Sequence, residues 1–184
     1  FFNGKANINF QNNLNVIELE ELKERKDLQA VVVQIFILQI TDQMFLGNRK
    51  TNYAIVFDEA WDMLRGKQSG SFIETLARRL RKYKGSLIVG TQGINDFYQS
   101  AGAQAAFDNS DWVCMLSQKQ ESIEQLKKSG KFNVTEHMEQ LLGSLHTKQG
   151  KYAKIMITHS DGYFIGRLIL DPFSRVLYST KPEE

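Results

Sequence analysis

The 184-residue sequence contains very little cysteine and proline, and no repeated or low-complexity segment. Its one cysteine, Cys114, excludes an internal disulfide and fits a reducing compartment. Because Cys114 lies in the apolar run "WVCML", we expect it to be a small core hydrophobe. The two prolines, Pro172 and Pro182, leave no proline-rich linker. These absences favour one ordinary globular domain with a hydrophobic core.

Strong charge and long apolar runs are also absent. The formal net charge of +2 at pH 7 gives no electrostatic indication of a strongly acidic or nucleic-acid partner. The most apolar run, residues 30–40, is interrupted by Gln34 and Gln39 and is too short to cross a bilayer. No segment has the pattern of a signal peptide. We therefore expect no transmembrane segment.

The first part of the chain alternates between apolar runs and turn signals. Residues 15–22, "NVIELEEL", predict a strand running into a turn. Residues 27–45 predict a long helix, so apolar that we expect it to pack on more than one side. Residues 51–57 follow the turn-forming Gly47 and Asn48, and this short apolar run predicts a fully buried parallel strand.

The remaining segments continue the alternation and then change character. We expect a helix over residues 71–84 that is stopped by Gly85. Further along we expect a strand over 86–92, a broken helix over 95–107, a strand over 111–117, and helices over 121–129 and 135–142. Residues 152–170 alternate around Ser160-Asp161-Gly162, which predicts an antiparallel hairpin. The pattern is typical of an α/β fold with a mostly parallel sheet flanked by helices and an appended hairpin.

Polar side chains follow two of the predicted parallel strands at the point where each strand ends. Asp58 and Glu59 end the first in "YAIVFDEAWDML", and Thr91 and Gln92 end the next in "SLIVGTQ". Ligands of such sheets bind beyond the carboxyl ends of the strands, so we expect Asp58 and Thr91 to contribute to nucleotide binding there. In many phosphate-cleaving ATPases, an Asp in this place holds Mg²⁺ through water and a Glu polarises the attacking water. The alternative is that Asp58 or Glu59 caps a short helix starting near Ala60.

The second strand end favours the ATPase interpretation. A neutral Gln92 at a strand tip can hydrogen-bond both a γ-phosphate oxygen and a water. A basic helix precedes this strand, carrying Arg78, Arg79, Arg81 and Lys82. Its cations are either a solvated helix face or a finger that reaches into a neighbouring subunit's site. Arg81 and Lys82 are the best placed for the second role, because they lie nearest the strand entrance.

Three stretches together resemble the C-terminal part of the TraC-type ATPases of conjugative type IV secretion systems. They are "YAIVFDEAWDML", "FIETLARRLRKYKGSLIVGTQGINDFY" and "LILDPFSRVLYSTKPEE". The resemblance implies a RecA-like P-loop ATPase of the HerA/FtsK group that uses ATP and Mg²⁺. By this resemblance Asp58 and Glu59 match the Walker B pair, Gln92 matches the sensor glutamine, and the basic cluster before the strand matches the region expected to offer arginine fingers.

The same resemblance implies a place and partners. Members of this family act as peripheral proteins at the cytoplasmic face of the bacterial inner membrane. They power assembly of the conjugative pilus and channel, typically as hexamers, together with inner-membrane secretion subunits. Two other functions stay open at this point: a DNA-pumping translocase or coupling protein, and a docking module for secretion subunits. Nucleic-acid binding also stays open, although the small basic patches have no aromatic residues between them and do not form a nucleic-acid track.

One element of the family pattern is missing. The Walker A loop, GxxxxGK[ST], has no match, and Gly4-Lys5 is followed by Ala6 and lacks the earlier glycine. We expect this loop to lie upstream of Phe1, so that residues 1–184 are the C-terminal portion of one RecA-like domain. Residues 1–14 are then a tail or part of an upstream subdomain. A chain without the phosphate loop is expected to bind ATP poorly.

Overall fold

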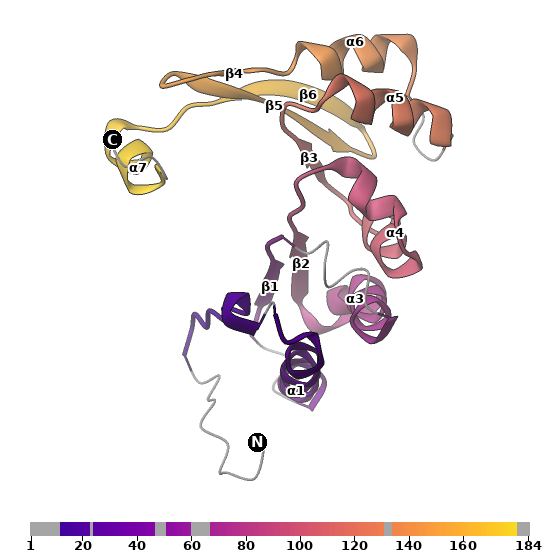
Figure 1. Cartoon of the computed structure of the whole chain (residues 1–184), viewed down its shortest axis with the longest axis vertical. Coiled ribbons are helices and arrows are strands. Elements are labelled where there is room, and N and C mark those ends of the chain that lie inside the picture. The colour runs from indigo at the N-terminus through magenta and orange to yellow at the C-terminus, as the bar shows by residue number, and fades with distance from the viewer. Residues whose placement is uncertain (1–11, 23, 47–50, 60–66, 131–133, 180–184) are drawn as a thin grey trace. The chain divides into compact units, whose positions relative to one another are not determined.

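A computed structural model describes residues 12–22, 24–46, 51–59, 67–130 and 134–179 of the chain (Figure 1). The chain divides into two compact units, Phe1–Leu46 and Gly47–Glu184, and each is described by itself.

The first unit contains a short 3₁₀ helix η1 (Glu20–Leu22) and a long helix α1 (Lys26–Leu46). The predicted helix is therefore confirmed, but the strand predicted over residues 15–22 is wrong. The described residues before η1 have no regular structure, and Val16 is 76% exposed. A strand is stabilised by a neighbouring strand and a buried face, and this segment has neither among the described residues.

Helix α1 buries one face and exposes another. Val33, Ile37 and Met44 are buried, whereas Val31 and Leu38 are 44% and 57% exposed. The expectation of packing on more than one side is therefore not met within the described residues. By length and composition, Asp27–Leu46 is long and apolar enough to span a membrane, a criterion that core helices of soluble proteins also meet. The absence of a transmembrane segment stays a prediction.

The second unit begins with a parallel pair of strands, β1 (Tyr53–Phe57) and β2 (Gly85–Val89), in which Phe57 lies opposite Val89. The connection contains α3 (Lys67–Arg79) and the 3₁₀ helix η2 (Leu80–Tyr83). One face of the pair packs on a core of α3 and α4 residues, and this cluster comprises Ile73, Ala103 and Ala106 with Phe57, Phe72, Leu87 and Val89.

The other face of the parallel pair is exposed, which corrects the prediction of fully buried strands. Val56 and Ile88 are 61% and 53% exposed, and both point away from the core that Phe57 and Leu87 contact. Alternate side chains of a strand point to opposite faces, so a strand packed on helices on one side only buries every second residue.

The third predicted strand does not join the parallel sheet. β3 (Val113–Met115) pairs antiparallel with β5 (Tyr152–His159), and Met115 lies opposite Met156. Both methionines are buried, in the core that this sheet shares with the two helices that follow β3 in sequence. Cys114 lies between the two inward residues of β3 and is exposed, so its predicted place in the core is wrong.

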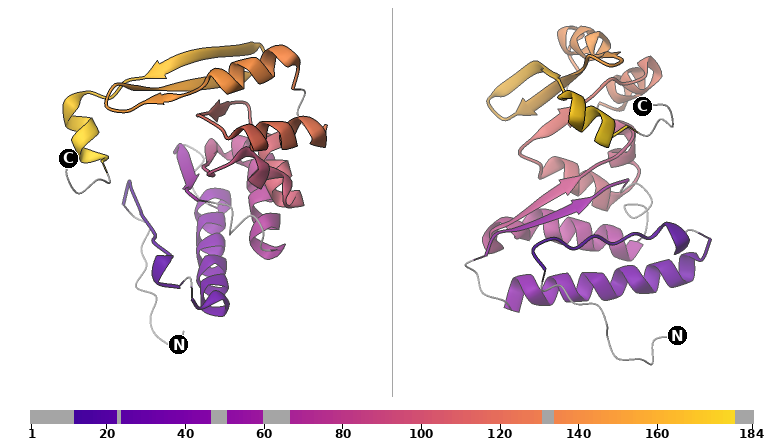
Figure 2. Two further views of the ribbon diagram at one scale, coloured as in Figure 1. Left: turned by 45° about the horizontal axis from the view of Figure 1, so that its top comes forward. Right: turned by 90° about the vertical axis from the view of Figure 1, so that its left-hand side faces the viewer.

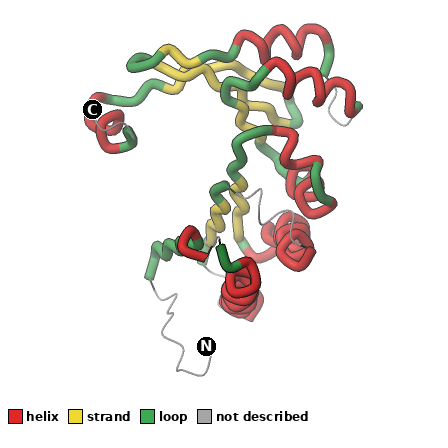
Figure 3. Tube along the Cα trace, viewed as in Figure 1, coloured by secondary structure: helices red, strands yellow, loops and turns green. Residues whose placement is uncertain are grey.

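The antiparallel sheet also contains β4 (Thr147–Lys148) and β6 (Gly162–Leu168), both paired with β5. The hairpin of β5 and β6 turns at Ser160-Asp161, as predicted, and His159 pairs with Gly162. Figure 3 shows the strands of this sheet and the helices that accompany them. The short helix α7 (Pro172–Leu177), which the sequence analysis missed, follows β6 at the end of the hairpin (Figure 2).

The remaining helices agree with the sequence. The broken helix is η3 (Ile94–Tyr98) followed by α4 (Ala101–Asp108), and the later pair is α5 (Gln120–Ser129) and α6 (Glu136–Ser144). Their apolar side chains form a core with the antiparallel sheet, comprising Ile94, Met115, Ile123, Leu126, Leu142, Leu145 and Met156. The second unit is thus a mixed α/β structure with a short parallel sheet and a small antiparallel sheet.

One predicted helix end lies a residue away from its expected place. Lys84, with φ 57°, takes the left-handed position at the end of η2, and Gly85 is already the first residue of β2. The Lys84 amide donates to the carbonyl of Arg81, so the cap satisfies a helix-end carbonyl without glycine.

Candidate functional site

The chain turns immediately after β1, and the turn carries both predicted carboxylates. Asp58 Oδ1 accepts a hydrogen bond from the backbone amide of Glu59 at 3.0 Å. Glu59 has φ 48°, in the left-handed region that costs a non-glycine residue about 1–2 kcal/mol. Glu59 therefore occupies a position whose backbone conformation glycine would adopt at a lower energy. The alternative helix start near Ala60 lies outside the described residues.

Gln92 joins the tips of the two parallel strands. Its amide Nε2 donates to Glu59 Oε1 at 3.3 Å. The backbone of Gly90 also donates to the carbonyl of Phe57 at 2.8 Å, which continues the pairing one step beyond the strands. The predicted residues Asp58, Glu59 and Gln92 are thereby brought together at the carboxyl end of the sheet.

Gly90 contributes to this end of the sheet, and the sequence analysis missed it. A Cβ placed on Gly90 would lie 3.2 Å from Asp58 Oδ1, which is tighter than ordinary contact. The lack of a side chain thus lets the Asp58 carboxylate lie beside β2. The available signal was a glycine between an apolar run and the Thr91-Gln92 pair.

The residues of this cluster differ in exposure and in role. The side chains of Asp58, Glu59 and Gln92 are exposed, so a ligand can reach them from solvent. Thr91 is half-buried, and its hydroxyl donates to the carbonyl of Gly93 at 2.9 Å. This bond holds the turn after β2. Thr91 therefore has a structural contact, although the sequence analysis predicted a nucleotide-binding role.

Arg81 and Lys82 lie at the other end of β2. Both are exposed on η2, before Gly85, whereas Gln92 follows Val89. A five-residue strand is about 17 Å long at roughly 3.3 Å per residue. The structure therefore does not bring these cations to Asp58 and Glu59 of the same chain.

The basic helix also contains an ordinary surface ion pair. Arg78 and Glu74 are 3.0 Å apart, one helical turn from each other; the Arg78 side chain is largely exposed and the Glu74 side chain is partly exposed. Such pairs contribute about 0.3–0.5 kcal/mol to stability. Arg78 thus fits a solvated helix face.

Among the described residues, no group of three or more His, Cys, Asp or Glu side chains is arranged to hold a metal ion. Asp58 offers a single carboxylate at the strand end, and one oxygen of that carboxylate, Oδ1, accepts the hydrogen bond from the amide of Glu59. This suits Mg²⁺, which is commonly held by one or two carboxylates while it keeps several waters.

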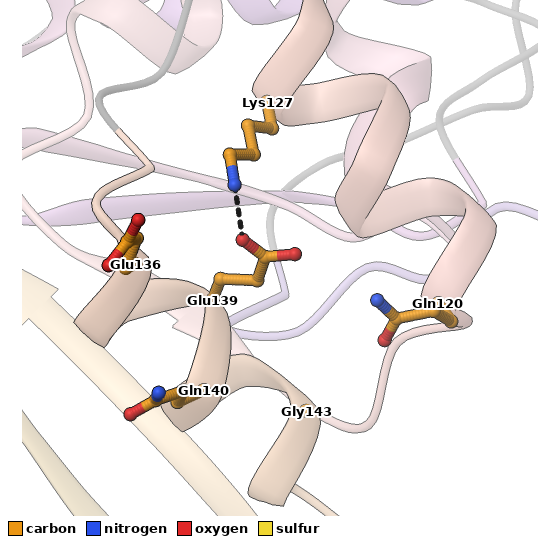
Figure 4. A pocket seen from close by; sticks show the side chains of 6 residues that line it. All are labelled: Gln120, Lys127, Glu136, Glu139, Gln140 and Gly143. Carbon is orange, nitrogen blue, oxygen red and sulfur yellow. Dashed lines mark hydrogen bonds and ion pairs between the residues drawn. The ribbon is translucent and has the colours of Figure 1, made fainter.

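A pocket of different character lies between α5 and α6 (Figure 4). Lys127 Nζ and Glu139 Oε2 are 2.6 Å apart in it, and the hydrogen bond to Glu139 raises the pKa of Lys127. The other lining residues are Gln120, Glu136, Gln140 and Gly143. None of the predicted site residues lines this pocket, and its charged pair is already mutually satisfied.

Comparison with known proteins identifies a family and a similar solved structure. The family model of the TraG P-loop domain matches residues 1–165. Among solved structures, VirB4 of Thermoanaerobacter pseudethanolicus is similar, with 26% sequence identity and a TM-score of 0.61 over 83% of this chain. The chain spans only 40% of the length of that VirB4 chain. No match is found among curated proteins.

The family match covers the first unit and most of the second, and it includes both strand tips. The similarity to VirB4 agrees with the resemblance that the sequence motifs carry. The chain therefore belongs to the TraG P-loop domain family and is part of a type IV secretion ATPase domain of the VirB4/TraG kind.

Proposed function

We propose that this chain supplies the water-activating half of an ATP site in a RecA-like ATPase that powers assembly of a conjugative pilus and channel. Glu59 acts as the general base, Asp58 holds Mg²⁺ through water, and Gln92 contacts the terminal phosphate. The observation that carries the proposal is the hydrogen bond from Gln92 to Glu59, which gathers these side chains at the carboxyl end of two parallel strands. Ligands of α/β sheets bind at that end.

The residues at the strand tips fit the chemistry of Mg²⁺-ATP. Asp58 and Glu59 supply hard carboxylate oxygens, and both are open to solvent. Mg²⁺, when bound, would neutralise charge on the phosphate oxygens. Glu59 would accept a proton from water, and general bases of this kind contribute about 10²–10⁴-fold to rate.

These residues lack the part of an ATP site that binds the phosphates of the nucleotide. The 184 residues contain no GxxxxGK[ST] motif, and the amides and lysine of that loop supply most phosphate contacts in related ATPases. Asp58 with one glutamine is a weak substitute. The 184-residue chain should therefore bind Mg²⁺-ATP with a Kd on the order of millimolar or weaker.

Arg81 and Lys82 support a site completed by a second subunit. They are exposed at the end of β2 opposite Gln92, so a cation there is available to a neighbour rather than to its own chain's site. This fits self-association as a ring, such as a hexamer, with each finger reaching the next protomer's nucleotide. Docking on inner-membrane secretion subunits, with the ATPase peripheral at the cytoplasmic face, belongs to the same proposal.

The proposal is tested by Glu59→Gln in the intact ATPase. Nucleotide binding should persist, because Asp58 remains, while turnover should fall by about 10²–10⁴-fold because the base is lost. Glu124→Gln, which changes an exposed carboxylate on α5, is the matched control and should turn over like wild type. Turnover of Glu59→Gln within a few-fold of wild type would show that Glu59 is not the base.

A further inference from the structure

Strand β6 lies at an open edge of the antiparallel sheet (Figure 1). Among the described residues β6 pairs with β5 alone, whereas β3 and β4 occupy the other side of β5. The pairing of β6 with β5 is continuous from His159–Gly162 to Ala153–Leu168. The side of β6 that faces away from β5 is therefore a regular strand edge to which another strand can be added.

The register shows which backbone groups this edge presents. The amide of Lys154 donates to the carbonyl of His146 at 3.1 Å, on the β4 side of β5. Lys154 and its β6 partner Arg167 therefore form a non-hydrogen-bonded pair, in which the N–H and C=O of Arg167 point away from β5. The direction repeats at every second residue, so Tyr163 and Ile165 also present their N–H and C=O groups at the open edge.

The open edge of β6 lacks the features that usually prevent one strand from pairing with another. Gly162–Leu168 contains no proline, no lysine and no bulge, and Arg167 is its single charged residue. Phe164, Leu168 and Ile165 are 54%, 48% and 37% exposed, so apolar side chains are open to solvent on both faces of the strand. Such an edge favours the addition of a strand from another chain.

The sequence of β6 is complementary to itself. When two copies pair antiparallel, all residues of the strand find a partner only if Ile165 lies opposite Ile165. Tyr163 then lies opposite Arg167 of the second copy, a pair that allows a cation–π contact across the strands. Arg167 already makes such a contact with Tyr152 in its own chain, with the guanidinium 4.6 Å from the ring centroid.

The same register also satisfies the other face of the strand. Phe164 lies opposite Gly166 of the second copy, and each strand contributes one such pair. A glycine in a strand has no side chain to pack, and an aromatic ring on the neighbouring strand covers it. Both faces of β6 therefore favour this one alignment.

We propose that β6 is a dimerisation strand, which pairs antiparallel with β6 of a second copy of this chain about a two-fold axis at Ile165. Tyr163, Ile165 and Arg167 of each copy donate and accept backbone hydrogen bonds across the axis. The contact is isologous, whereas a ring of subunits is built from heterologous contacts, so it is separate from the interface of Arg81 and Lys82. The inference does not rest on the proposed ATP site.

Sedimentation of the 184-residue chain tests the association. One strand pair is a small interface of the kind found in weak complexes, so wild type should change from monomer to dimer between about 10 μM and about 1 mM. Ile165→Lys should raise the dimer Kd by about tenfold or more, because like charges would lie directly opposite each other. Thr147→Lys adds the same charge on β4, beyond the other side of β5, and should dimerise like wild type.

Two outcomes of the sedimentation experiment would overturn the proposal. One is a wild-type chain that stays monomeric over the whole concentration range, which would leave the edge free or available to another partner. The other is an Ile165→Lys variant that dimerises as strongly as wild type, which would place the contact elsewhere.

Disulfide cross-linking tests the register with variants that add no charge to β6. In a Cys114→Ser background, Ile165→Cys brings two cysteines opposite each other with Cα atoms about 5.5 Å apart, within the range of a disulfide. Leu168→Cys is the matched control on the same strand. Leu168 lies opposite Gly162 of the second copy, so its equivalent is about 20 Å away.

Under mild oxidation, Ile165→Cys should form disulfide dimers about tenfold faster than Leu168→Cys or more, because only the first pair satisfies disulfide geometry. Equal rates for the two variants would indicate parallel or slipped strands and would overturn the two-fold register. Absence of disulfide dimers in Ile165→Cys would overturn the proposal as well.

Discussion

The two ends of the parallel strand pair contain the same backbone conformation for different reasons. Glu59 at the carboxyl end has φ 48° and Lys84 at the amino end has φ 57°. Both are non-glycine residues in the left-handed region. At the amino end the conformation belongs to a helix cap, in which the Lys84 amide donates to Arg81 and the Lys84 carbonyl accepts from Tyr53 at 3.1 Å. At the amino end, these backbone hydrogen bonds offset the strain of the left-handed conformation.

At the carboxyl end, side-chain hydrogen bonds offset the backbone strain instead. Asp58 accepts from the Glu59 amide, and Gln92 holds the Glu59 carboxylate. These side chains are exposed and contribute little core packing. Backbone strain that is held in place by exposed polar side chains is typical of functional positions. At such positions the geometry of the site is maintained although it lowers the stability of the fold. The left-handed position at the amino end is therefore structural, whereas the left-handed position at the carboxyl end is where we expect chemistry.

The largest expected difference between the two ends is in folding stability. Leu80 is 2% exposed at the amino end, and Leu80→Ala should lower the free energy of unfolding by about 2–4 kcal/mol through lost packing and a cavity. Gln92→Ala at the carboxyl end should change it by about 0.5 kcal/mol or less. Urea denaturation of the two variants measures both. A loss above roughly 2 kcal/mol in Gln92→Ala would make Gln92 a structural residue.

A second difference concerns which subunit each end serves. If the proposed function holds, protomers with Arg81→Ala lack the finger and protomers with Glu59→Gln lack the base, so each should be inactive alone. In a 1:1 mixture, about a quarter of randomly formed interfaces combine an intact base with an intact finger, and ATP turnover should recover in that proportion.

The same mixture with Lys82→Ala in place of Arg81→Ala identifies which cation reaches the neighbour. If ATP turnover does not recover at any mixing ratio, Arg81 and Lys82 belong to a solvated helix face.

The smallest expected effect is a gain. Glycine adopts positive φ at little cost, so both Glu59→Gly and Lys84→Gly should raise the free energy of unfolding, by about 0.5–1 kcal/mol each. Thermal unfolding of the 184-residue chain measures it. Gly150, which has φ 70°, provides a control in the opposite direction. Gly150→Ala should lower the free energy of unfolding, because alanine adopts positive φ less readily than glycine. A destabilised Glu59→Gly would mean that the side-chain contacts of Glu59 outweigh its backbone strain.

The sequence predicted the elements whose signals are local. Helix α1 and the alternating hairpin of β5 and β6 lie close to their predicted places, and the bounds of β1 and β2 lie within three residues of those predicted from their apolar runs. The positions of Asp58, Glu59 and Gln92 at one edge followed from strand order alone, because parallel strands carry their carboxyl ends to the same side.

The failures depend on contacts between segments distant in sequence. β3 pairs with β5 in the antiparallel sheet, with Met115 opposite Met156, and the run "WVCML" carries no local signal for that distant partner. The exposure of Cys114 follows from that same pairing. The Glu59–Gln92 hydrogen bond depends on the register of β1 against β2, and the positive φ of Glu59 has no local sequence signal such as glycine or asparagine.

The most direct test compares glycine at the two left-handed positions in the intact ATPase. Both variants should fold at least as stably as wild type, so any difference in turnover reports chemistry. Lys84→Gly should hydrolyse ATP within a few-fold of wild type, whereas Glu59→Gly should lose about 10²–10⁴-fold in kcat, because only the second removes a base. Equal turnover by the two variants would contradict the assignment of the carboxyl end as the catalytic end.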